Sequence, residues 1–139
     1  MDASLVFDRA DAVGQWVAQR VEQSASWGDF YAMGAQIDGQ IVAGVVFNNY
    51  NGANCTVHIA IERRGRFLID LFRAVCDYAF RRCGLKRMTG MVPASKPHVL
   101  AFYLHLGFEE EFVMREAAHD GGDLHVLVMR PAGCRWLAE

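Results

Sequence analysis

The sequence lacks any long hydrophobic run. No stretch approaches the roughly 20 consecutive apolar residues that a membrane-spanning helix needs, although 53% of the 139 residues are hydrophobic. The first residues, MDASLVFDRAD, also lack the basic segment, apolar segment and cleavage site of a secretory signal. We therefore expect a cytoplasmic protein without membrane association.

An excess of charge of either sign is missing as well. The formal net charge is −2, so the chain as a whole does not attract nucleic acid or an anionic membrane surface. Such a partner would need a local basic patch, and the best one is the turn that contains Arg63, Arg64 and Arg66. This patch is only the size of a loop, so we do not expect a nucleic-acid partner.

The motifs of several large enzyme classes are absent. The chain has no GxGxxG, Walker, GxSxG or HExxH motif, and its five histidines are dispersed. Its cysteines, at positions 55, 76, 83 and 134, are too scattered for a CxxC metal pair, although an even count permits a disulfide. In a cytoplasmic protein we expect reduced thiols and no bound metal.

Repeats, low-complexity tracts and Pro- or Gly-rich linkers are also missing. A length of 139 residues suits one domain, so residues 1–139 are expected to form a single unit. What the chain does have is a succession of short apolar, β-prone runs and segments with helical spacing. The expected strands are 4–7, 30–37, 40–47, 56–61, 87–93, 108–114 and 124–129.

Helical spacing of apolar residues predicts helices within 8–21, 67–80 and 98–106. Asp8 or Asp11 is a candidate N-cap for the first helix and Ser95 for the third. Gly84 and Gly107 are expected to end the second and third helices.

Turn residues fix how the strands connect. Asp38-Gly39 predicts a two-residue hairpin turn, and the polar run 48–54 predicts a second turn. Asp120 and Asp123 are expected to shape the last turn. Strands in succession followed by a β-α-β unit predict an α/β (α+β) fold, with a mixed, mostly antiparallel sheet and helices on both faces.

Three features together resemble the GCN5-related N-acetyltransferase superfamily: the order of the elements, the arginine-rich turn after TVHIAI, and AFYLHLGFEEE followed by a final hairpin. The ending MRPAGCRW is similar to small phage and prophage members. The resemblance covers residues 3–136. It implies an acyl-CoA N-acyltransferase fold that transfers acetyl directly from acetyl-CoA to a primary amine of a small molecule or protein, without a metal, and it permits a homodimer.

The resemblance places acetyl-CoA where strands 56–61 and 87–93 splay apart. The main chain of Ile59, Ala60 and Ile61 would then pair with the pantetheine arm, as an added strand would. The pyrophosphate would lie at the start of the next helix, because unpaired N–H groups there attract an anion. The other implied cofactor residues are Arg63, Arg64, Gly65, Arg66, Phe67, Leu68 and Lys96.

This turn departs from the family pattern, which usually reads Arg or Gln, two residues, Gly, one residue, then Gly or Ala. Counting from Arg63 puts Arg66 and Leu68 at the small positions, and counting from Gly65 puts Phe67 at the second. Lys96-Pro97 also stands where many relatives have an Asn that contacts the cofactor. The alternative hypothesis is therefore an inactive acetyltransferase-like binding module with a degenerate cofactor loop.

Tyr103 lies four residues before Gly107 and matches the tyrosine that protonates the departing thiolate in the family. A phenol is protonated at neutral pH and suits that role. However, Val99, Phe102, Tyr103 and Leu106 also form one helical stripe, which is typical of a core. Catalytic acid and core aromatic remain two interpretations of this tyrosine.

The expected base is His58 or Glu62, which share one face of the strand TVHIAIE. A histidine can accept the amine proton directly or through water, but a half-buried imidazole bonded to the backbone is the competing interpretation. The strand RMTGMVPA lacks the carboxylate that many family members carry there. The run 109–111 or His125 would be other sources of a base.

Overall fold

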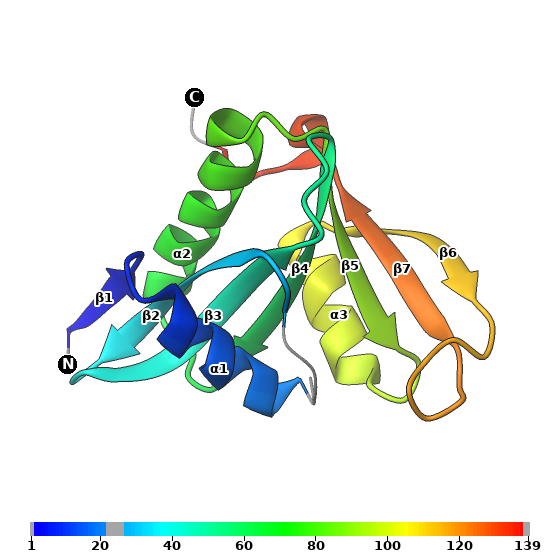
Figure 1. The fold of residues 1–139 in the computed structure, drawn as a ribbon, viewed down its shortest axis with the longest axis horizontal. Helices are drawn as coiled ribbons and strands as arrows, with labels where there is room; N and C mark the ends of the chain where they lie inside the picture. Colours follow the sequence, from blue (N-terminus) through cyan, green and yellow to red (C-terminus); the bar gives the residue numbers. More distant parts are fainter. Residues whose placement is uncertain (1, 22–26, 138–139) are drawn as a thin grey trace.

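The computed structural model describes residues 2–21 and 27–137. Its strands form one sheet in the order β1-β2-β3-β4-β5-β7-β6 (Figure 1). All neighbouring strands are antiparallel except β4 and β5, which are parallel. The predicted mixed, mostly antiparallel sheet is therefore confirmed. The strands are β1 (Ala3–Val6), β2 (Phe30–Ile37), β3 (Gln40–Asn48), β4 (Asn54–Ile61), β5 (Arg87–Pro93), β6 (Glu109–Met114) and β7 (Leu124–Met129).

Helices cover both faces of the sheet, as predicted. They are α1 (Ala10–Arg20), α2 (Phe67–Cys76), a π-helical continuation η1 (Asp77–Arg82), α3 (Pro97–Leu106) and a short 3₁₀ turn η2 (Pro131–Gly133). The second helix was predicted as one α-helix, but its last six residues are π-helical. Within the described residues, no helix is long and apolar enough to cross a membrane.

Helix α1 packs on one face of the central strands. Its buried residues Val13 and Val17 join Val46 of β3 and Ala60 of β4 in one apolar cluster. Gly44 allows the close approach, because a β-carbon there would lie 2.7 Å from Cγ2 of Val17. The even-numbered side chains of β4 therefore face α1.

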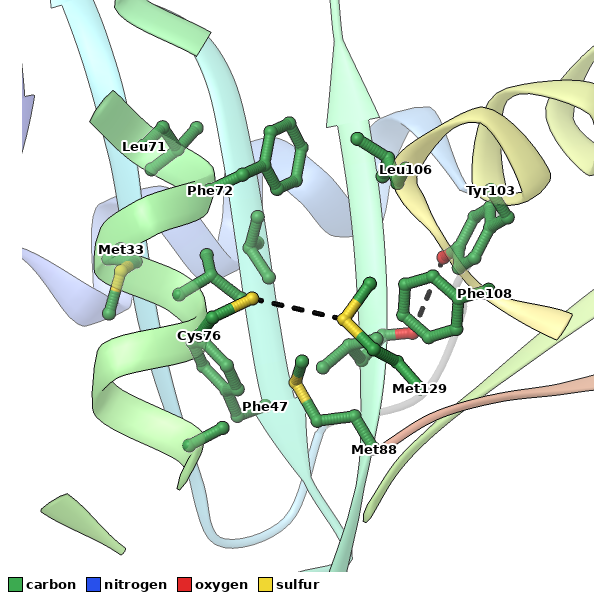
Figure 2. Close-up of a cluster of buried hydrophobic side chains, with 14 of the residues drawn as sticks. Met33, Phe47, Leu71, Phe72, Cys76, Met88, Tyr103, Leu106, Phe108 and Met129 are labelled. Carbon is green, nitrogen blue, oxygen red and sulfur yellow. Dashed lines mark hydrogen bonds between the residues drawn. The ribbon is translucent and has the colours of Figure 1, made fainter. Parts of the chain in front are cut away.

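Helices α2 and α3 cover the opposite face, where the larger core lies (Figure 2). Leu71 and Phe72 of α2 are buried there, and Phe72 lies 5.8 Å between ring centroids from Trp136 near the C-terminus. Tyr103 and Leu106 of α3 belong to the same core. The C-terminal segment thus packs against the helices that cover this face.

The predicted N-caps were wrong, whereas Gly107 ends α3 as predicted. Helix α1 has Arg9 at its N-cap with no side-chain capping bond. Asp11 lies inside the first turn, where the negative charge of a carboxylate interacts favourably with the helix dipole. Helix α3 has Lys96 rather than Ser95 at its N-cap. The N–H of Lys96 donates to Pro93 O at 3.0 Å. Because residues 93–96 form this tight turn, the helix begins at Pro97, one residue later than a cap at Ser95 would place it.

The one parallel pair among the described strands is short. Strands β4 and β5 are in register at Asn54–Thr56 and Arg87–Thr89, and beyond Thr56 and Thr89 they diverge. Figure 1 shows them opening as a V from the end where they pair. The part of β4 from Val57 to Ile61 therefore presents an edge to the space between the strands.

Candidate active site

A cavity of about 640 Å³ lies where β4 and β5 part. Its lining includes His58 and Ala60, which face α1, and Ile59, Ile61 and Phe102, which pack on the α2 side. The opening thus connects both faces of the sheet. The site residues proposed from the sequence that line it are His58, Ile59, Ala60, Ile61, Glu62, Arg64, Lys96 and Tyr103.

The strand register shows which backbone groups face the cavity. The N–H of Glu62 donates to Val42 O of β3 at 2.8 Å, and Ala60 is opposite Gly44 in the same ladder. In an antiparallel ladder alternate residues turn both backbone groups toward the same neighbour. The groups of Ala60 therefore point to β3, while those of Val57, Ile59 and Ile61 point to β5.

Tyr103 lies at the inner end of this opening. Its hydroxyl donates to the carbonyl oxygen of Val57 at 3.4 Å, and its side chain is 4% exposed (Figure 2). Burial raises the pKa of Tyr103 above the ordinary value, and the backbone N–H of Ile59 acts in the opposite direction. The hydroxyl thus occupies the first place on β4 where a β5 partner is missing, and it is protonated at neutral pH.

His58 is held by the end of β3. Its Nε2 lies 3.0 Å from Oδ1 of Asn48, whose Nδ2 donates to the carbonyl oxygen of Trp27 at 3.3 Å. That second bond orients the amide, so Nε2 carries the hydrogen and Nδ1 keeps its lone pair. The ring also packs on Trp27 at 4.6 Å between centroids, and burial lowers the pKa of His58 to about 4. His58 is therefore a neutral, oriented imidazole whose partner is a side chain rather than backbone.

Glu62 has a partner at the rim of the cavity. Its Oε2 accepts from Nε of Arg20 at 2.8 Å. Arg20 in turn lies over the ring of Trp16 at 3.9 Å, and it also lines the cavity. The carboxylate of Glu62 consequently forms an ion pair with an arginine of α1. His58 takes no part in that ion pair.

The turn before α2 is only partly turned toward the cavity. Arg64 lines it and lies 5.2 Å from the ring centroid of Phe102. Among the described residues, Arg63, Gly65, Arg66, Phe67 and Leu68 do not line the cavity. The ring of Phe67 lies close over Gly65, because a β-carbon there would be 2.8 Å from Cε1 of Phe67.

At the start of α2 two of the first N–H groups already have partners. The N–H groups of Leu68 and Ile69 bond to Gly65 O and Arg66 O at 3.1 and 3.0 Å. The first N–H groups of a helix have no intrahelical partner, and Arg66 is the N-cap here. The N–H groups of Arg66 and Phe67 make no hydrogen bond within the described residues, so an anion at this turn would find those two donors and the guanidinium of Arg64.

The far wall of the cavity was not predicted. It is formed by residues just before α3, by α3 itself and by the loop between β6 and β7, including His98, His119 and Asp120. Asp120 also has its expected turn role, accepting from the N–H of Gly122 at 2.9 Å. That bond and the hydroxyl of Ser95 lower the pKa of Asp120. Ser95 thus bonds to the loop instead of capping α3, and this long-range contact has no local sequence signal.

The other candidate bases lie away from the cavity. His125 contacts Glu110, and Glu111 accepts a bidentate pair from Arg87 at 2.8 and 3.0 Å. None of these residues is part of the described cavity lining. Across residues 2–21 and 27–137, no group of three or more His, Cys, Asp or Glu is placed to hold a metal ion.

The fold matches solved enzymes at low sequence identity. A structure of the dodecameric spermidine N-acetyltransferase of Vibrio cholerae gives a TM-score of 0.75 at 13% identity and covers 94% of each chain. The chain has an N-acetyltransferase fold. Mutant forms of the spermidine/spermine N-acetyltransferase of that organism match with a TM-score of 0.74, 13% identity and coverage of 94% of this chain and 96% of that one. A manganese complex matches with a TM-score of 0.72 at 13% identity, covering 92% of each chain.

The sequence comparisons add no family assignment. No family model matches the chain, and no curated protein matches it. The likeness therefore lies in the arrangement of strands and helices that produces the opening between β4 and β5.

Proposed function

We propose that the chain is an acetyl-CoA-dependent N-acetyltransferase that transfers acetyl directly to a primary amine of a small molecule or protein. One observation carries the proposal. The opening between β4 and β5 joins a cavity that reaches both faces of the sheet, and the hydroxyl of Tyr103 bonds to β4 at its inner end. Two substrates can approach such an opening from opposite faces and meet there.

The residues present fit acetyl-CoA, which when bound would supply an acetyl thioester. The carbonyl of Ile59 and the N–H of Ile61 face the opening and suit the amide groups of a pantetheine arm. Arg64, Lys96 and the first turn of α2 would hold the phosphates. The N–H and carbonyl of Ala60 point to β3, so they would not bond to the pantetheine arm. Ala60 would contribute only its side chain to the lining of the cavity.

His58 is the proposed general base. Its Nδ1 can take a proton from the attacking amine, directly or through one water, while Nε2 stays bonded to Asn48. A pKa of about 4 makes it a weak base. The amine proton becomes acidic only as the N–C bond forms, so a weak, fixed base can act late in that step. Glu62 is the alternative base, but it shares its charge with Arg20.

Tyr103 is the proposed donor to the departing sulfur. Its hydroxyl is protonated at neutral pH and faces the inner end of the cavity. A preorganised donor aimed at a site of developing negative charge lowers the barrier. The same bond to Val57 also gives the tyrosine a structural role, so both interpretations from the sequence apply to one hydroxyl.

A second candidate function is an acetyltransferase-like binding module without activity. The observation that favours it is the ring of Phe67 over Gly65, which fills space that a small residue would leave beside the phosphates. Calorimetric titration of the protein with CoA separates the two. Measurable heat of binding supports the enzyme, and its absence in folded protein supports the module.

The test of activity is thiol release from acetyl-CoA with a panel of primary amines that begins with spermidine, because the compared enzymes are spermidine N-acetyltransferases. Three variants separate the roles. We expect Tyr103→Phe and His58→Gln to lower kcat by roughly 10²-fold or more, and Glu62→Gln to lower it less. Full activity in Tyr103→Phe would remove the hydroxyl from the mechanism.

Strand β6 favours a homodimer. It is an edge strand whose six residues are all exposed, and the side chain of Phe112 is 50% exposed. The exposed apolar half of this edge, Phe112, Val113 and Met114, invites pairing with a second chain. Sedimentation of the wild type and of Phe112→Glu tests this, and a monomeric wild type at micromolar concentration would contradict it.

A further inference from the structure

Two cysteines that the proposed reaction does not use lie side by side. Sγ of Cys134 is 3.0 Å from Sγ of Cys76, although the residues are 58 positions apart, and both are free thiols. Cys76 is buried in α2, and its sulfur also lies 3.8 Å from Sδ of Met129 (Figure 2). Cys134 follows the η2 turn and is half-buried. One thiol of the pair is therefore accessible and the other is shielded.

The surroundings divide the two thiols chemically. The thiol of Cys134 donates to the sulfur of Cys76. The contact with Cys76 and the backbone N–H groups of Trp136 and Leu137, which point to the sulfur of Cys134, lower the pKa of Cys134. The same contact and burial raise the pKa of Cys76. The thiolate is the nucleophilic form of a cysteine, the one that attacks a peroxide. Cys134, which is half-buried and has the lowered pKa, is thus the nucleophile of the pair, and the buried Cys76 lies within reach of it as the second thiol.

The remaining cysteines lack this arrangement. Cys55 is buried, and burial raises its pKa to about 12. Cys83 lies next to Tyr78, whose own pKa burial and the Cys83 contact raise to about 12. These two thiols therefore provide an internal comparison for selectivity.

We propose that Cys134 is a site of oxidation by hydroperoxides that resolves as a disulfide with Cys76. The sulfur of Cys134 attacks one oxygen of hydrogen peroxide and becomes a sulfenic acid. The O–O bond breaks, and the released hydroxide takes the thiol proton and leaves as one water. The sulfur of Cys76 then attacks the sulfenic sulfur. The S–S bond forms, the S–O bond breaks, and the hydroxide leaves with the proton of Cys76 as a second water.

The disulfide would tie the C-terminal segment to α2. That segment is now held by Nε1 of Trp136, which donates to Leu106 O at 2.7 Å, and by the packing of Trp136 on Phe72. Phe72 also packs on Phe102 at 6.2 Å, and Phe102 lines the cavity. A covalent link at Cys134 would therefore fix a segment that supports both helices beside the cavity.

The test uses the full chain in reduced form, treated with hydrogen peroxide at pH 7 and digested without reductant. Mass spectrometry should find a peptide that links Cys76 to Cys134 with the loss of two hydrogens, formed at a rate independent of protein concentration. Closing a loop of this length should raise Tm by roughly 5–15 °C, reversibly with dithiothreitol. Cys134→Ser should abolish the link and the shift, whereas the matched Cys83→Ser should retain both.

The wild-type digest decides the matter even if a variant folds poorly. Peroxide treatment that leaves Cys76 and Cys134 unlinked, or that carries Cys134 on to sulfinic acid, would overturn the proposal. So would preferential oxidation of Cys55 or Cys83 in protein whose circular dichroism is native.

Discussion

The ring of Tyr103 on α3 packs directly against Gly90 of β5, with no space for a side chain at that position. A β-carbon on Gly90 would lie 2.6 Å from Cε2 of Tyr103 and 3.7 Å from Cε2 of Phe108. The ring of Tyr103 therefore rests on bare backbone of β5, and this position lets its hydroxyl reach Val57 on the neighbouring strand. The glycine in the strand RMTGMV thus serves the tyrosine of another element.

Gly90→Ala should displace the tyrosine ring. Overpacking of this kind costs about 1–3 kcal/mol of unfolding free energy, and a displaced hydroxyl should also lower acetyl transfer. Urea unfolding and thiol release measure the two effects. Gly133→Ala is the matched control, because a β-carbon there meets nothing within 4 Å. Equal stability of both variants would show that the ring is not held against Gly90.

Burial of neutral His58 makes stability depend on pH. Its pKa is about 4 in the folded protein and 6.5 ordinarily, so below pH 6.5 the unfolded chain binds a proton that the folded one refuses. The contribution of neutral His58 to the free energy of unfolding is therefore complete above about pH 6.5 and is lost as the pH falls toward 4. Wild type should lose about 2 kcal/mol more than His58→Gln between pH 7.5 and 5.

Urea unfolding of both proteins at the two pH values measures that difference. The exposed His105 on α3 supplies the control, since His105→Gln should keep the wild-type pH dependence. A parallel loss in wild type and His58→Gln would mean that the imidazole is protonated in the folded protein.

Two neighbouring arginines should differ in their effect on CoA affinity. Arg64 lines the cavity and lies over Phe102, whereas Arg63 does not line it. A hydrogen bond to a charged phosphate is worth enough for roughly a tenfold change in Kd. Calorimetry should therefore show about tenfold weaker CoA binding for Arg64→Gln and less than about twofold for Arg63→Gln. The reverse order would place the phosphates on the outer side of the turn.

Gly107 ends α3 at a φ of 113°, a backbone angle that residues with a side chain rarely adopt. Its surroundings leave ordinary space, since a β-carbon would lie 3.6 Å from Cε of Met129. Gly107→Ala should thus cost about 1–2 kcal/mol through the backbone alone. Gly107→Asn should cost less, because Asn tolerates left-handed conformations better. Equal losses in urea unfolding would contradict this explanation.

Features decided by adjacent residues were predictable. Asp38 and Gly39 have φ of 52° and 78°, as the hairpin turn at this pair requires. Gly107 ends its helix, and the strand bounds differ by only one or two residues. These features depend on turn geometry and on the spacing of apolar side chains, which a single sequence displays.

Features decided by distant partners were not predictable. The polar run from Asn48 predicts a turn, but Asn48 ends β3 and orients His58 ten residues later. Ser95 is a reasonable cap until its hydroxyl bonds to Asp120. The pairing of Cys76 with Cys134 likewise depends on how the C-terminal segment crosses α2. Each of these contacts is set by packing that brings separate elements together.

The short register between β4 and β5 leaves the interior of this sheet with a ladder that stops after three residue pairs. A bound pantetheine would supply the hydrogen bonds that β5 does not make to the end of β4. Ligand should therefore slow amide hydrogen exchange at Ile61 far more than at Ala60, whose N–H already faces β3. The protein without ligand is in this sense a sheet with an internal edge, shielded at its inner end by a single tyrosine hydroxyl.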